Sequence, residues 1–177
     1  MKEINSWFIG WFKVWDNINY NLKILNKLYL YYNNELEEKE LLLKPITILI
    51  VSIIEALLDD YFYRIYSFTR EGINGLSEEK LKKIREKKYE DFNNYINWSK
   101  KHNLFNSEDI FYEEIHYLRD IRNKIHIQLN YWNEDQVFTE LEKEKAEKKC
   151  YDIMDYLSKN HLRDKNKKCV DNFILPW

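Results

Sequence analysis

One stretch decides the fold class, and it reads INSWFIGWFKVWDNINYNLKILNKLYLYY at residues 4–32. Apolar or aromatic residues recur through it at alternating steps of four and three, as on one buried face of a long helix. This seam comprises Ile4, Phe8, Trp11, Trp15, Ile18, Leu22, Leu25, Tyr29 and Tyr32. With Asn5 or Ser6 as the capping residue, the stretch predicts a helix from its first turn onward. The first turns are apolar nearly all round, which predicts a second contact, either with another subunit or with the C-terminal tail.

The rest of the chain continues the same architecture. Four further segments with helical apolar periodicity lie at about residues 46–70, 77–101, 106–129 and 137–160. Only three glycines and two prolines occur, so long helices are favoured over many short strands. We therefore predict an all-α protein, an up-and-down bundle of about five long helices over residues 1–162. Residues 163–177 form a basic tail with an apolar terminus, which we expect to dock.

Charge and composition limit the classes of function. The net charge of −2 is unlike that of a dedicated DNA-binding protein, but it leaves room for local positive charge at an RNA site. The chain shows no signal-peptide pattern, and its two cysteines have neither metal-site spacing nor a disulfide framework. The most apolar run, Ile46 to Ile54, is too short to span a bilayer. These features predict a cytoplasmic protein without membrane contact.

A polar stripe marks the third of these four later segments, in the stretch LRDIRNKIH at residues 118–126. If the helix runs to Leu129, four polar residues lie along the edge of its apolar seam, at roughly 40° to 140° from the seam direction. They are Arg119, Arg122, Asn123 and His126. Glu55 interrupts the apolar run of residues 46–70, and a buried carboxylate needs a partner. An arginine of the stripe is the natural candidate, and a solvated position at the rim is the alternative.

Arginine and histidine together suit phosphodiester chemistry on RNA without a metal. A neutral histidine can take the proton of a ribose 2′-hydroxyl or protonate the leaving oxygen. Arginine can bind the phosphate through two parallel hydrogen bonds and stabilise the charge of the transition state. One helix supplies only part of such a site, but a homodimer with a two-fold axis would place two copies of the stripe in one cleft.

Other catalytic signals are absent from the sequence. There is no glycine-rich phosphate loop, no His-Glu-x-x-His zinc motif and no serine hydrolase or thiol protease pattern. Glu113 and His116 make one Glu-x-x-His pair, but a di-iron bundle needs two such pairs and two further glutamates. We therefore expect no metal and no cofactor, with a single zinc site left as an alternative.

The segment LRDIRNKIHI at residues 118–127 resembles the signature of HEPN domains. These are all-helical, usually dimeric domains of bacterial defence and toxin–antitoxin systems, and many are metal-independent ribonucleases. Their pattern is an arginine, a polar residue that is often asparagine, and a histidine, with four to six residues between the arginine and the histidine. Arg119 and His126 have six residues between them, with Asp120 as the polar follower, whereas Arg122-Asn123 gives the usual dipeptide only three residues before His126. Which arginine takes the family role stays open.

The resemblance implies a HEPN-type endoribonuclease that leaves 2′,3′-cyclic phosphate ends and acts in phage defence or as a toxin. It implies Arg119, His126, Arg122 and Asn123 as catalytic residues, for which Glu55 and Asp120 would be supporting residues. An antitoxin or a defence protein would be its partner. The alternative is a non-enzymatic helical dimerisation or interaction module, in which the arginines and the histidine make structural ion pairs with Glu55, Asp59 or Asp60.

Overall fold

The protein is described by a computed structural model, which covers residues 2–34, 38–88, 90–125, 136–163 and 170–177. Within these residues it has six helices and two short strands, which confirms the predicted all-α bundle. In chain order the elements are β1 (Lys2–Ile4), α1 (Phe12–Asn34), α2 (Lys39–Ser67), α3 (Glu78–Arg85), α4 (Phe92–Lys101), α5 (Asp109–Asn123), α6 (Glu140–Asn160) and β2 (Phe173–Leu175).

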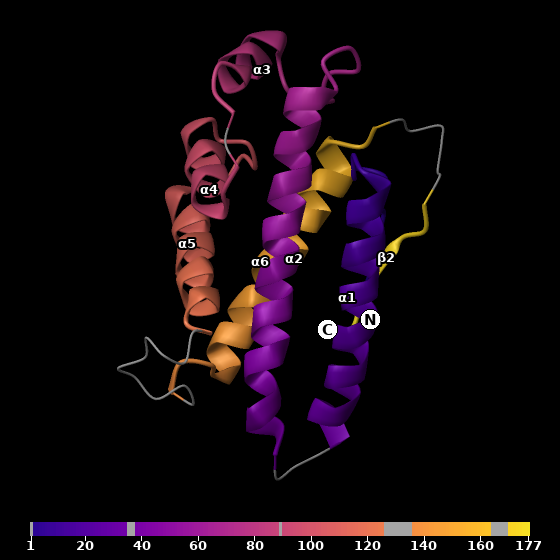
Figure 1. Ribbon diagram of the computed structural model, residues 1–177, viewed down its shortest axis with the longest axis vertical. Helices are drawn as coiled ribbons and strands as arrows, with labels where there is room; N and C mark the ends of the chain where they lie inside the picture. The colour runs from indigo at the N-terminus through magenta and orange to yellow at the C-terminus, as the bar shows by residue number, and fades with distance from the viewer. Residues whose placement is uncertain (1, 35–37, 89, 126–135, 164–169) are drawn as a thin grey trace.

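Helix α2 is the central element of the bundle. It runs the length of the molecule between α1 on one side and α4 with α5 on the other, while α6 crosses behind it (Figure 1). Ile46, Ile50, Ile54, Leu58 and Phe62 on it are fully buried. Burial of each such side chain contributes about 1.5–3 kcal/mol, so α2 holds the largest share of the core.

By length and composition alone, α2 is the one described helix that could cross a membrane. Half of its most apolar window is buried inside the protein, and the core helix of a soluble bundle passes the same test. The nine-residue run Ile46 to Ile54, counted from the sequence, therefore understates the apolar length of this helix. The absence of membrane contact and the cytoplasmic location stay predictions.

The predicted start of the first helix is wrong. Residues 2–4 form β1, and α1 begins only at Phe12, because the buried carboxylate of Asp60 accepts hydrogen bonds from the backbone of Gly10 (2.7 Å) and Trp11 (2.9 Å). A carboxylate at this position satisfies the orphan N–H groups at the helix start. Gly10 is required there, since a Cβ would lie 2.3 Å from Cγ of Arg64.

The two ends of the chain meet beside α1. β1 and β2 pair antiparallel, with Lys2 opposite Leu175 and Ile4 opposite Phe173. Phe173 is fully buried and stacks with Trp15 at 6.3 Å between ring centroids. The apolar terminus thus docks on the first helix, which is the second contact predicted from the apolar first turns.

Further helix boundaries differ from the prediction. The segment 77–101 contains two helices, because Asp91 is extended and its side chain accepts the N–H of Asn94 as the cap of a new helix, α4. Helix α2 begins at Lys39, before the expected start near residue 46, so Pro45 lies inside it. Helix α6 starts at Glu140, slightly later than expected, whereas α3 begins where expected, with Ser77 as its cap.

Candidate functional site

Helix α5 carries Arg119, Arg122 and Asn123 of the polar stripe, and we call the two arginines the arginine stripe. Its apolar face, from Phe111 to Ile121, is buried in the bundle and fixes the helix against α2, α4 and α6. The helix ends at Asn123, not near Leu129 as predicted, because the last turn tightens: the N–H of Lys124 donates to the carbonyl of Ile121, and the N–H of Ile125 donates to that of Arg122. His126 follows this turn and lies outside the described residues. Its expected position on the same helix, two turns after Arg119, stays a prediction.

Arg122 is held by Glu55 of α2. The two form an ion pair between Nη2 and Oε2, and the guanidinium carbon of Arg122 lies 5.9 Å from the ring centroid of Phe92. The Arg122 side chain is 24% exposed and that of Glu55 is 34% exposed, so the pair sits at the rim of the core. The expectation that Glu55 meets an arginine of the stripe is confirmed. Asn123, the next residue, is exposed, and its Oδ1 accepts a hydrogen bond of 3.3 Å from Arg122.

Arg119 lies one turn earlier and turns toward α4. Its Nη2 lies 2.6 Å from Oδ1 of Asp120, and its Nη1 donates to Oδ1 of Asn93. Its side chain is 21% exposed, whereas the Asp120 side chain is 58% exposed. The guanidinium therefore has oxygen acceptors on two sides and access to solvent, which is the environment of an anion-binding arginine as well as of a structural one.

Two further pairs of side chains continue this contact between α4 and α5. Nε2 of His116 lies 3.0 Å from Oδ1 of Asn97, and Lys100 bonds to Glu113 at 3.2 Å. The side chains in these contacts are spaced three residues apart on α5, and four and then three residues apart on α4. His116 was not predicted as a site residue, although it lies three residues before Arg119 and hence on the same stripe.

His116 is a candidate proton acceptor. Burial, and next the charge of Arg119, lower its pKa below the usual value, so the neutral ring is favoured near pH 7. The two residues of the Glu-x-x-His motif contact different side chains: Glu113 bonds to Lys100, and His116 lies beside Asn97. No group of three or more metal-ligating side chains occurs in the described part of the chain.

The acidic residues named for the structural alternative are used elsewhere, apart from Glu55. Asp59 accepts a hydrogen bond of 2.6 Å from the Tyr95 hydroxyl, and Asp60 caps α1. Arg119 and Arg122 therefore have Glu55 and Asp120 as their carboxylate partners among the described residues.

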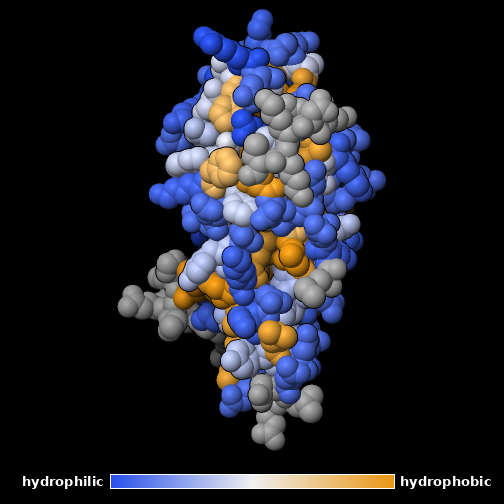
Figure 2. All heavy atoms as spheres, turned by 90° about the vertical axis from the view of Figure 1, so that its right-hand side faces the viewer, coloured by the Kyte–Doolittle hydropathy of each residue, from blue (hydrophilic) through white to orange (hydrophobic). Residues whose placement is uncertain are grey.

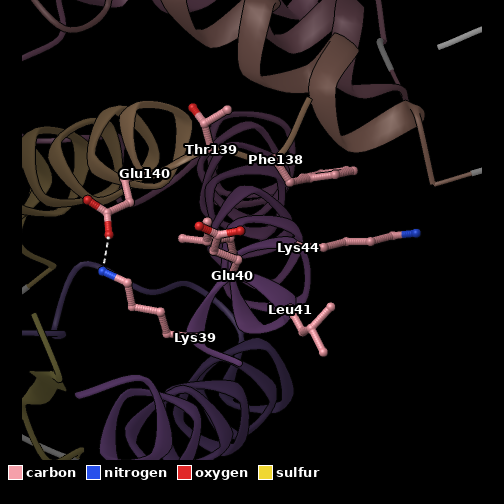
Figure 3. Close-up of a pocket in the computed structure, with 8 residues that line it drawn as sticks. Lys39, Glu40, Leu41, Lys44, Phe138, Thr139 and Glu140 are labelled. Atoms are coloured by element: carbon pink, nitrogen blue, oxygen red, sulfur yellow. Dashed lines mark hydrogen bonds and ion pairs between the residues drawn. The ribbon is translucent and has the colours of Figure 1, made fainter. Parts of the chain in front are cut away.

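A pocket of about 580 Å³ lies elsewhere, between the start of α2 and the start of α6. Lys39 turns toward Glu140 on one side of it, while Lys44 extends beside Phe138 on the other (Figure 3). The described residues that line it include none of Arg119, Arg122 and Asn123. We place the candidate site at the arginines because their chemistry fits a reaction, whereas the pocket combines paired charges with apolar walls.

Comparison of the chain with protein-family models, curated proteins and solved structures found no match. The HEPN resemblance thus rests on the short segment that includes the end of α5.

Proposed function

We propose that the protein is a metal-independent endoribonuclease of the HEPN type. In this reaction a ribose 2′-hydroxyl attacks the adjacent phosphorus, the 5′-oxygen leaves with a proton, and a 2′,3′-cyclic phosphate remains. His126 transfers the protons, Arg119 and Arg122 bind the phosphate oxygens, and Asn123 positions the phosphate. Neither a metal nor a cofactor takes part in this scheme.

One observation carries the proposal: two arginines one turn apart on α5 keep partial exposure while oxygen acceptors hold their guanidinium groups. An RNA phosphate offers the same oxygen geometry as the Glu55 and Asp120 carboxylates, so it can replace them. Glu55, Asp120 and Asn93 then act as positioning residues, which keep the arginines in place between turnovers.

The proposed active form is a homodimer with a composite site, since one stripe supplies only part of the required charge. On the face that includes α1 and the C-terminal strand, orange areas are separate and surrounded by hydrophilic side chains (Figure 2). A stable homodimer buries a more continuous apolar surface. We therefore place the dimer contact away from this face. A role in phage defence or as a toxin, with an antitoxin as partner, belongs to the same proposal.

The direct test is cleavage of single-stranded RNA by the purified protein in EDTA. We expect cleavage by the unmodified chain, and loss of cleavage in His126→Ala. The variant His116→Ala, which removes the histidine three residues before Arg119, is measured beside it: retained cleavage would assign the proton transfer to His126, and lost cleavage would assign part of it to His116. Equal rates for the unmodified chain and His126→Ala would refute the proton-transfer role of His126. Expression should also arrest the growth of the host, and His126→Ala should relieve the arrest.

A non-enzymatic interaction module is the second candidate. The observation that favours it is the engagement of both arginines by intramolecular partners, as in a structural network. Trp11 is its best contact residue, because its side chain is half exposed and stacks on Tyr63 at 5.7 Å. Trp177, at the apolar C-terminus, packs against the core beside Tyr29 and is the less accessible of the two. This function predicts that the purified protein does not cleave RNA. It also predicts that Trp11→Ala abolishes partner binding.

A further inference from the structure

A group of basic and aromatic side chains gathers where the C-terminal end of α4 meets α3. The His102 ring stacks on Trp98, with 4.8 Å between centroids and 20° between planes, and Nζ of Lys101 lies 4.4 Å from the Trp98 centroid. Lys80 and Lys83 of α3 are close enough for their charges to act on His102. We call Lys80, Lys83, Trp98, Lys101 and His102 the α3–α4 basic surface.

The charge balance of this surface is incomplete. Burial lowers the pKa of His102, and the charges of Lys101, Lys80 and Lys83 lower it further, so every charged side chain that shifts this pKa is positive. The carboxylate of Glu79 lies 2.7 Å from Nζ of Lys83 in an exposed pair, which is weak in water. A phosphate at this surface would relieve the repulsion among the lysines.

The surface is connected to the arginine stripe through α4. Lys101 and Asn93 are eight residues apart on this helix, which is about 12 Å along its axis. Asn93 accepts the hydrogen bond from Arg119, so the helix joins the basic surface at one end to the arginines at the other. Figure 1 shows α3 above α4, with α5 extending toward the opposite end of the molecule. A few nucleotides of a single strand can span this length.

We propose that the α3–α4 basic surface binds the sugar–phosphate backbone of single-stranded RNA and leads the strand to Arg119 and Arg122. The choice of RNA rests on the proposed ribonuclease function. The lysines would contact phosphates, and the stacked His102–Trp98 pair would hold Lys101 in place. Because the contacts are ionic, this binding should weaken steeply with salt.

The test measures binding separately from cleavage. A fluorescein-labelled 2′-O-methyl oligoribonucleotide, which lacks the attacking hydroxyl, is titrated with the full chain in EDTA at several salt concentrations. Lys80→Ala/Lys101→Ala should bind more weakly, and the slope of log K against log salt should fall by about 1.4, or about 0.7 per phosphate contact. Lys80→Arg/Lys101→Arg should retain binding, because it retains the charge.

The matched control is Lys23→Ala/Lys27→Ala, which removes two exposed lysines from α1. This variant should bind like the unmodified chain. The proposal is overturned if the unmodified chain does not bind the oligonucleotide, or if the two double-alanine variants lose equal affinity. Cleavage of natural RNA without any effect of Lys80→Ala/Lys101→Ala would refute the surface and leave the ribonuclease intact. Selective loss of binding in a chain that never cuts RNA would refute the ribonuclease and retain the surface.

Discussion

Arg122 and Glu55 join α5 to α2 through an ion pair at the rim of the core. The carboxylate contacts Nη2 of Arg122, a donor that an RNA phosphate would use in the proposed site, so the two would compete for it. Glu55→Gln keeps the shape and removes the charge. We expect it to tighten binding of a non-cleavable RNA severalfold, whereas Glu55→Asp, which retains the charge, should not. Weaker binding of Glu55→Gln would instead mean that Glu55 orients Arg122 for the substrate.

His161, at the end of α6, gives the protein a pH-dependent contribution to stability. Its Nδ1 lies 2.5 Å from the carbonyl of Asn74, and burial, followed by the charge of Arg64, lowers its pKa below the usual value. The unfolded chain therefore takes up a proton at a higher pH than the folded protein does. The stabilisation is complete above the ordinary histidine pKa of about 6.5, and it is lost as the pH falls below that value.

His161→Asn keeps a donor near the Asn74 carbonyl and removes the titration. It should be less stable than the unmodified chain at pH 7, because it loses the ring contacts with Tyr61 and Tyr156. The difference in unfolding free energy should shrink between pH 7 and pH 5, as urea denaturation would measure. A difference that stays constant or grows over this range would show that His161 is not the titrating group.

Asp60 determines where α1 begins. It is 2% exposed, and besides capping α1 it lies near the buried Arg64, while burial raises its pKa to about 6. Asp60→Ala should lower the unfolding free energy by about 1–3 kcal/mol, because two backbone donors lose their acceptor. The neighbouring substitution Asp59→Ala is the control, since the exposed Asp59 bonds only to Tyr95 among the described contacts. Thermal unfolding would measure both, and equal losses would contradict the capping role.

Helix periodicity was enough to predict the bundle, but not every boundary. The seam residues Ile18, Leu22, Leu25 and Tyr29 are buried as predicted, because the pattern repeats within one helix. The start of α1 depends on Asp60, which is distant in sequence, so no local signal indicates it. The division between α3 and α4 did have a local signal in Asp91, an ordinary N-cap residue that the continuous periodicity obscured.

The candidate site was predictable to a similar extent. An arginine of the stripe was one of two expectations for Glu55, based on the cost of an unpaired buried carboxylate, and the structure places Arg122 there. The acceptor of Arg119, Asn93, was not predictable, because it required α4 to be a separate helix antiparallel to α5. The end of α5 was misplaced, since apolar residues continue the periodicity to Leu129 while the backbone leaves the helix after Asn123.

The pairing of the two chain ends closes the bundle. Phe173 is fully buried against Phe8 and Trp15, whereas its neighbour Ile174 is 57% exposed. Phe173→Ala should therefore cost about 3–5 kcal/mol of unfolding free energy. Ile174→Ala removes a similar apolar side chain from the surface of the same strand and should change stability little. Similar effects of the two substitutions in chemical denaturation would contradict the docking of the C-terminal strand.

The proposed ribonuclease activity depends on the bundle fold, on the arginines of α5 and on the proposed homodimer. Its most direct measurement is the rate of single-stranded RNA cleavage in EDTA, with analysis of the product ends, for the unmodified chain and for Arg119→Ala, Arg122→Ala and the control Arg70→Ala. The account predicts 2′,3′-cyclic phosphate ends, a loss of roughly 100-fold or more for each stripe variant, and no loss for Arg70→Ala. Unchanged cleavage by both stripe variants, or no cleavage by the unmodified chain, would contradict it.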